Sequence, residues 1–112
     1  CPLRSETINL VNEEILEALG PQSYLIQISR GPIVNEDALI TALQNKTIAG
    51  AALDVFIDEP RVNPKFFTLD NVLLAPHIGT TTLEMREERR SKFMANINAY
   101  LNQQKMPYQV EI

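Results

Sequence analysis

The stretch Ile48-Ala49-Gly50-Ala51-Ala52-Leu53-Asp54-Val55-Phe56 is a run of nine residues with a single charge. Apolar runs of this length between turn residues are typical of strands buried in a parallel sheet. The small residues within the run indicate that a helix or a ligand packs close against it. We therefore expect a buried strand at residues 48–56.

Two further apolar runs and three helical patterns surround this strand. A largely buried strand is expected at residues 24–29, and a third strand at residues 72–75. Helices are expected at residues 12–19 and 36–46, with Asn12 and Asn35 as N-caps. Residues 57–71 are expected to form a loop, anchored by Phe66-Phe67.

A longer helix is expected from near Thr81, where Thr81-Thr82-Leu83-Glu84 has the spacing of a capping box. Phe93, Ile97 and Leu101 would share one face of this helix, and Met85, Met94 and Phe93 are expected in the core. Its charged run, including Glu88 and Lys92 at i,i+4, is expected to be a solvated face.

Helices that alternate with short apolar strands predict parallel strands joined by right-handed crossovers. The fold class is therefore α/β, as part of a Rossmann-like doubly wound parallel sheet. Because such a sheet has helices on both faces and more than three strands, the chain is expected to be a fragment.

The composition bounds the possible partners. A chain of 112 residues has room for one compact domain. Its net charge of −4 opposes nucleic-acid binding, and no apolar run approaches the roughly 20 residues that span a bilayer. Cys1 is the only cysteine, so no internal disulfide can form. Because the chain does not open on methionine, its true N-terminus is expected to lie upstream, and the expected partner is a small molecule.

Polar residues follow each of the three predicted strands. Arg30 follows the first, Asp54 closes the second with Glu59 just beyond, and His77 follows the third. In open α/β sheets the carboxyl ends of the strands form the edge where ligands bind. Each residue alone is more often structural than catalytic, and one histidine does not make a protein-only zinc site. Together, a guanidinium, a carboxylate and an imidazole at one edge favour carboxylate binding and proton transfer.

Four strings carry a family resemblance in the right order: Cys1-Pro2-Leu3 with Thr7, Ile28-Ser29-Arg30-Gly31, Gly50 to Phe56 with Glu59-Pro60, and Ala75-Pro76-His77-Ile78-Gly79. Together they resemble the D-isomer-specific 2-hydroxyacid dehydrogenases. Among these, the chain is most similar to members of the glyoxylate/hydroxypyruvate reductase type.

The resemblance implies an NAD- or NADP-dependent oxidoreductase that reduces a small 2-oxo acid to the D-2-hydroxy acid. It implies that Arg30 binds the substrate carboxylate and carbonyl oxygen, that His77 donates a proton, and that Glu59 fixes the imidazole tautomer and favours its protonated form. The implied cofactor-binding residues are Cys1, Pro2, Ile28, Ser29, Asp54, Gly79 and Thr80, with Asp54 toward the nicotinamide end. A cytoplasmic location and a homodimer of the full-length protein are also implied.

The sequence departs from the family pattern in two ways. Gln27 stands where Asn is frequent and Asn35 where Asp is frequent, and neither position is expected to carry the chemistry. No Gly-x-Gly-x-x-Gly occurs, so the phosphate-binding loop and the substrate domain are expected upstream of Cys1. The choice between NAD and NADP and the identity of the 2-hydroxy acid stay open.

Residues 1–112 are therefore expected to be the C-terminal part of a dinucleotide-binding domain. The last helix and tail, about 81–112, would pack back on the substrate domain. The isolated chain is expected to be inactive because it lacks the glycine loop. The alternative is a non-catalytic nucleotide-binding or protein-interaction module on the same fold, either corepressor-like or a remnant.

Overall fold

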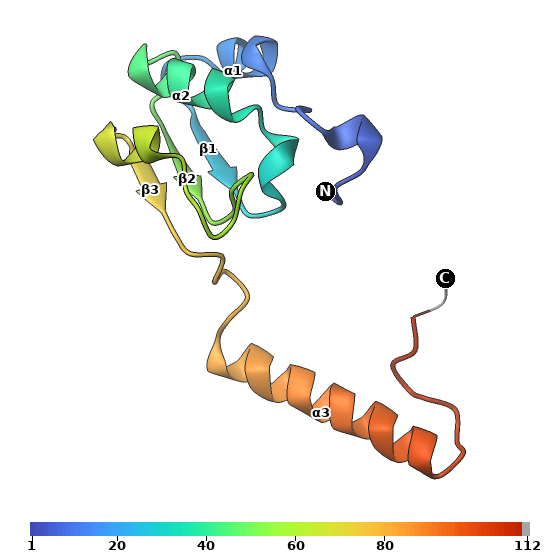
Figure 1. Ribbon diagram of the computed structural model, residues 1–112. Coiled ribbons are helices and arrows are strands. Elements are labelled where there is room, and N and C mark those ends of the chain that lie inside the picture. Colours follow the sequence, from blue (N-terminus) through green and yellow to red (C-terminus); the bar gives the residue numbers. More distant parts are fainter. Residues whose placement is uncertain (111–112) are drawn as a thin grey trace. The chain divides into compact units, whose positions relative to one another are not determined.

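The structure is a computed structural model in which residues 1–110 are described (Figure 1). It divides into two compact units, Cys1–Gly79 and a second unit that starts at Thr80. The expected ranges 1–112 and 81–112 therefore include two final residues that lie outside the described part. Among the described residues, no helix is both long and apolar enough to cross a bilayer.

The first unit contains a three-stranded parallel sheet in the order β1-β2-β3. The strands are β1 (Tyr24–Gln27), β2 (Gly50–Leu53) and β3 (Val72–Leu74). In the register, Leu25 of β1 pairs with Ala51 of β2, which pairs with Val72 of β3. The predicted α/β class and parallel topology are confirmed, although each strand is shorter than predicted.

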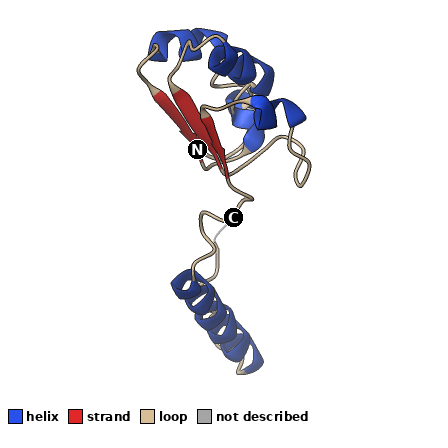
Figure 2. Ribbon diagram, turned by 90° about the vertical axis from the view of Figure 1, so that its left-hand side faces the viewer, coloured by secondary structure: helices blue, strands red, loops and turns tan. Residues whose placement is uncertain are grey.

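Helices α1 (Glu13–Leu19) and α2 (Glu36–Gln44) lie on one face of the sheet (Figure 2). Both predicted asparagine caps are confirmed, since Asn12 Oδ1 accepts from the amide of Ile15 at 3.1 Å and Asn35 Oδ1 from that of Ala38 at 3.0 Å. Helix α2 ends two residues before the predicted Lys46, which adopts a left-handed φ of 55° that no helix interior allows.

Three short 3-10 helices were not predicted: η1 (Ser5–Thr7), η2 (Gly31–Ile33) and η3 (Pro64–Thr68). The last lies inside the segment predicted as a loop, where Asn63 caps it and Pro64 takes its first position. Phe66 is buried and anchors the segment as expected, whereas its neighbour Phe67 is exposed.

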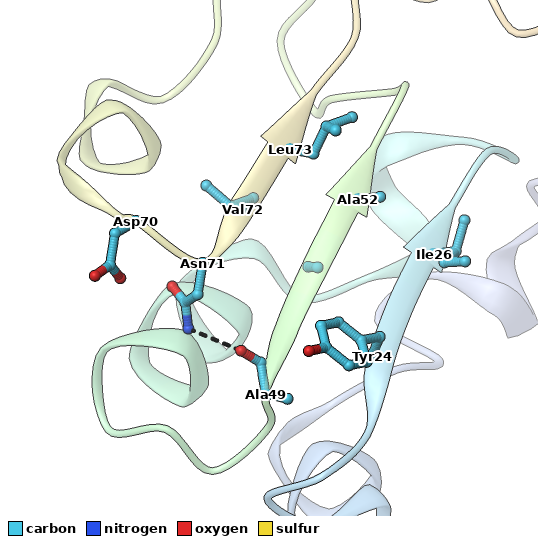
Figure 3. Close-up of a pocket in the computed structure, with 9 residues that line it drawn as sticks. Tyr24, Ile26, Ala49, Ala52, Asp70, Asn71, Val72 and Leu73 are labelled. Carbon is cyan, nitrogen blue, oxygen red and sulfur yellow. Dashed lines mark hydrogen bonds between the residues drawn. The ribbon is translucent and has the colours of Figure 1, made fainter.

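The core lies between the sheet and helices α1 and α2. Its most deeply buried side chains are Leu16, Leu39, Leu43, Ile48 and Phe66. The opposite face of the sheet is open, and we call the side chains of Tyr24, Ile26, Ala52 and Leu73 the open face (Figure 3). The prediction that residues 24–29 form a largely buried strand is wrong, because Ile26 is 69% exposed there. Strands buried on both faces need helices on both, and the helices of the first unit cover only one.

The second unit contains helix α3 (Leu83–Leu101), which begins one residue later than predicted. Thr82 rather than Thr81 is its N-cap, and its side chain accepts from the amide of Met85 at 3.2 Å. The predicted Glu88–Lys92 ion pair is confirmed. Phe93, Met94 and Leu101 were expected to share a buried face or the core, but they are exposed.

Two side chains of α3, those of Asn96 and Lys92, contact the chain that follows the helix. Asn96 Oδ1 accepts from the amide of Tyr108 at 2.9 Å, and Asn96 Nδ2 donates to the carbonyl of Tyr108 at 3.2 Å. The Lys92 ammonium also lies 5.6 Å from the centre of the Tyr108 ring. These contacts fold the tail back along α3.

Candidate active site

The three strands end at one edge of the sheet, and we call this the carboxyl edge. The segments that leave it carry Arg30 after β1, Asp54 and Glu59 after β2, and His77 after β3. Their approach to one another follows from the parallel topology, since parallel strands present all their carboxyl ends on one side.

His77 and Glu59 are in direct hydrogen-bonding contact at this edge. Nδ1 of His77 lies 2.7 Å from Oε2 of Glu59, and Oε1 of Glu59 accepts from the amide of Phe56 at 3.0 Å. The hydrogen bond from His77, followed by that from Phe56, holds the pKa of Glu59 below its usual value. A carboxylate only accepts, so the proton sits on Nδ1 and Nε2 is left for another partner.

Asp54 fixes the segment that carries His77. Asp54 is 7% exposed, and its two carboxylate oxygens accept from the amides of Ile78 and Gly79, each at 2.8 Å. These two hydrogen bonds lower the pKa of Asp54. His77 itself adopts φ 54°, a left-handed conformation that costs energy for a non-glycine residue and is concentrated at functional sites.

Arg30 is exposed at the same edge. Its Nη1 donates to the carbonyl of Ser29 at 2.7 Å, and its positive charge lies near enough to Glu59 to help lower the pKa of that carboxyl. Directly after it, Gly31 packs against the Phe56–Ile57 peptide so closely that a Cβ would stand 2.1 Å from the carbonyl carbon and oxygen of Phe56. Only glycine allows the two segments to pass there.

A hollow of about 220 Å³ lies on the open face where it meets the carboxyl edge. It is lined by side chains of all three strands and of the segments that follow them, namely Ile26, Ile28, Ala52, Leu53, Asp54, Leu73, Ala75, Ile78 and Gly79. Its exposed walls are apolar, which suits a flat, weakly polar ring. The residues present therefore fit the nicotinamide end of a dinucleotide.

The structure brings together part of the predicted cofactor set. Ile28, Asp54 and Gly79 line the hollow, whereas Ser29, Cys1 and Pro2 do not. Cys1 and Pro2 are exposed, and the carbonyl of Pro2 accepts from the hydroxyl of Thr7 at 2.9 Å. Thr80 belongs to the second unit, where its hydroxyl accepts from Nη2 of Arg89 at 2.9 Å.

Gln27 also lies at this edge. Gln27, expected to carry no chemistry, is buried and bonds to both Ser29 and Arg30. A polar side chain inside an apolar run was the signal available for it. Within residues 1–110, no three His, Cys, Asp or Glu side chains are grouped as metal ligands.

Comparison with known proteins gives a consistent result over most of the chain. Residues 1–79 match the family described as D-isomer specific 2-hydroxyacid dehydrogenase, NAD binding domain. The chain is 44% identical over 102 residues to a hydroxyphenylpyruvate reductase of Plectranthus scutellarioides. This alignment covers 91% of the chain and 33% of the relative. It is 46% identical over 99 residues to a glyoxylate reductase of Pyrococcus furiosus, and this alignment covers 88% of the chain and 30% of the relative.

Solved structures show the same likeness. An NADPH-dependent glyoxylate/hydroxypyruvate reductase of Sinorhizobium meliloti, crystallised with NADP and malonate, superposes with a TM-score of 0.89 at 39% identity, over 98% of this chain and 34% of that one. A protein of Polaromonas described as a D-isomer specific 2-hydroxyacid dehydrogenase superposes with a TM-score of 0.93 at 34% identity, over 98% of this chain and 34% of the other. The chain spans about a third of the length of the curated relatives it matches.

Proposed function

Because the chain belongs to the D-isomer specific 2-hydroxyacid dehydrogenase family, we propose that the full-length protein reduces a small 2-oxo acid to the D-2-hydroxy acid with NADH or NADPH. The observation that carries this proposal is the His77–Glu59 pair, 2.7 Å apart, at the carboxyl edge of the sheet. Ile78, the residue after His77, lines the apolar hollow. Names of relatives support glyoxylate or hydroxypyruvate as the substrate.

Arg30 binds the substrate in this proposal. Its guanidinium is planar and always charged, so it can bond to the carboxylate and the carbonyl oxygen of a 2-oxo acid at once. In the structure Arg30 is exposed, and its Nη1 donates to the backbone carbonyl of Ser29 in its own turn. A substrate carboxylate would replace that neutral acceptor by a charged one.

His77 supplies the proton. With Nδ1 held by Glu59, the free Nε2 donates its proton to the carbonyl oxygen of the substrate, which becomes the hydroxyl group. The Glu59 carboxylate balances the charge of the imidazolium before the transfer. A reduced nicotinamide bound in the hollow would supply the hydride to the carbonyl carbon.

The cofactor would be held in two parts. Asp54, Ile28 and Gly79 would surround the nicotinamide end, and Cys1, Pro2, Ser29 and Thr80 would line the rest of the crevice. The sequence contains no Gly-x-Gly-x-x-Gly loop, so the phosphates would bind to another part of the full-length protein.

The site would lie in a larger protein. Residues 1–112 would form the C-terminal part of the dinucleotide-binding domain, with residues 81–112 packed on the substrate domain. The exposed apolar side chains of Phe93 and Leu101 support this packing, since large exposed side chains on one helix favour a covered surface. We also propose a cytoplasmic homodimer.

The test is an assay of the full-length protein for reduction of glyoxylate and hydroxypyruvate. The oxidation of NADH or NADPH is the readout. We expect turnover in the parent and a loss of roughly 10²–10⁴-fold in His77→Ala, the usual range for removal of a general acid. Near-parental turnover of the variant across the pH range would remove His77 from the mechanism. No turnover in a parent that binds NAD(P)H would favour the non-catalytic alternative.

A further inference from the structure

Only two polar side chains are buried among the described residues, Gln27 and Asp54, each 7% exposed. Both stand at the carboxyl ends of neighbouring strands. Asp54 uses its two oxygens to hold the segment that carries His77. A buried amide such as that of Gln27 is unfavourable unless it is hydrogen-bonded, so its partners show what it holds.

Gln27 uses both ends of its amide within the next three residues. Its Nε2 donates to the carbonyl of Arg30 at 2.9 Å, and its Oε1 accepts from the hydroxyl of Ser29 at 2.8 Å. The amide of Ser29 lies 3.4 Å from the same oxygen. The side chain therefore spans the turn between β1 and η2, where the backbone has no strand partner.

The other side of Arg30 is fixed by the backbone. Its carbonyl also accepts from the amide of Ile33 at 3.1 Å, and the next residue, Gly31, packs directly on the Phe56–Ile57 peptide. The Gln27 side chain therefore holds the carbonyl of Arg30 from the β1 side, while Ile33 and the packing of Gly31 hold the chain that follows Arg30.

We propose that Gln27 is a positioning residue that fixes the turn carrying Arg30, and so aims its guanidinium at the substrate carboxylate. The inference rests on the proposed role of Arg30 in substrate binding. If Gln27 only satisfied its own buried amide, its loss would lower stability without a selective effect on carboxylate binding. If it positions Arg30, affinity for the 2-oxo acid falls while affinity for the cofactor does not.

The experiment uses Gln27→Met in the full-length protein, because Met keeps the length of the side chain and removes both amide atoms. We expect KM for glyoxylate and Ki for oxamate, a non-reducible analogue with the same carboxylate, to rise roughly 10- to 100-fold. KM for NAD(P)H is expected to stay within about twofold. Gln44→Met, the same change at an exposed position of α2, is the matched control.

A double variant separates positioning from simple destabilisation. Arg30→Lys alone should also weaken glyoxylate binding, because an ammonium lacks the two-pronged contact. If Gln27 acts through Arg30, adding Gln27→Met to Arg30→Lys should weaken binding by less than the product of the two single effects. Fully multiplicative effects would overturn the proposal.

The remaining outcomes are also decisive. An unchanged Ki for oxamate in a folded Gln27→Met protein would overturn the positioning role while leaving the proposed function intact. An inactive parent would instead reject the proposed function. If Gln27→Met does not fold, Gln27→Asn replaces it, because its amide is one methylene shorter and reaches the Arg30 carbonyl less well. A raised Ki for oxamate with an unchanged KM for NAD(P)H would then support the role, and a parental Ki would overturn it. Failure of both variants to fold would assign Gln27 to stability alone and reject the proposal.

Discussion

The carboxyl edge and the open face are built from the same three strands, yet their side chains are supported very differently. At the edge, Asp54, Glu59 and Gln27 each bond to backbone groups that fix their positions. On the open face, Ile26 and Leu73 are 69% and 65% exposed, and no helix of the first unit covers them. The edge is therefore preorganised by short-range contacts within the chain itself, whereas the open face is not.

The largest expected effect comes from the edge. Glu59→Gln in the full-length protein should lower kcat/KM for 2-oxo-acid reduction by roughly 10²–10⁴-fold, because the amide has no charge to balance the imidazolium of His77. Steady-state kinetics with glyoxylate measures this effect. Asp58→Asn is the matched control, since that neighbouring carboxylate pairs with Arg61 at the surface. Equal losses in both variants would show that the edge is not specifically organised around Glu59.

A pair of leucine substitutions compares the open face with the face of the sheet that packs on the core. In the 112-residue chain, Leu53→Ala should lower the free energy of unfolding by roughly 2–5 kcal/mol, because Leu53 is 3% exposed in the core. Leu73→Ala, on the neighbouring strand, should change it by about 0.5 kcal/mol or less. Urea denaturation followed by circular dichroism at several protein concentrations measures both. A concentration-dependent cost for Leu73→Ala would show that a second copy covers the open face.

The smallest expected effect is a pH dependence of stability at the edge. The pKa of Asp54 is lowered in the folded state by the Ile78 and Gly79 amides. Its contribution to stability is therefore complete above the ordinary aspartate pKa, about 3.9, and is lost as pH falls through the lowered value. The thermal midpoints of the parent and of Asp54→Asn should converge as pH is lowered from 7 to 3. Asp58→Asn should follow the parent, and parallel curves for Asp54→Asn would contradict the assignment.

The local signals in the sequence predicted the elements well. Asn12 and Asn35 cap their helices because a short side-chain oxygen accepts a hydrogen bond from a free amide of the first turn. This interaction is local and does not depend on the rest of the fold. At α3, adjacent threonines offered two caps one residue apart, and the structure uses the second. The 3-10 helix at Pro64–Thr68 was missed because a segment with two prolines and asparagines is equally typical of a loop.

Burial was predicted less well, since it depends on what lies beyond the segment. The apolar run at Tyr24 to Ser29 has the composition of a strand covered on both faces, but only Leu25 and Gln27 turn toward the helices. Within the site, the edge placement of Arg30, Glu59 and His77 followed from topology. The support by Gln27 did not, because it depends on the path of a turn that sequence spacing does not specify.

The contact at Gly31 has a consequence for mutational scans of this protein. Any side chain there would collide with the Phe56 carbonyl group, 2.1 Å from the position of a Cβ, and the collision would separate the segment bearing Arg30 from the one bearing Glu59. A scan that scores activity alone would rank Gly31 with the residues that contact substrate, although it has no side chain to do so. Pairing each activity score with a separate measure of substrate affinity and of folded protein would place Gly31 among the residues that set the geometry of the site.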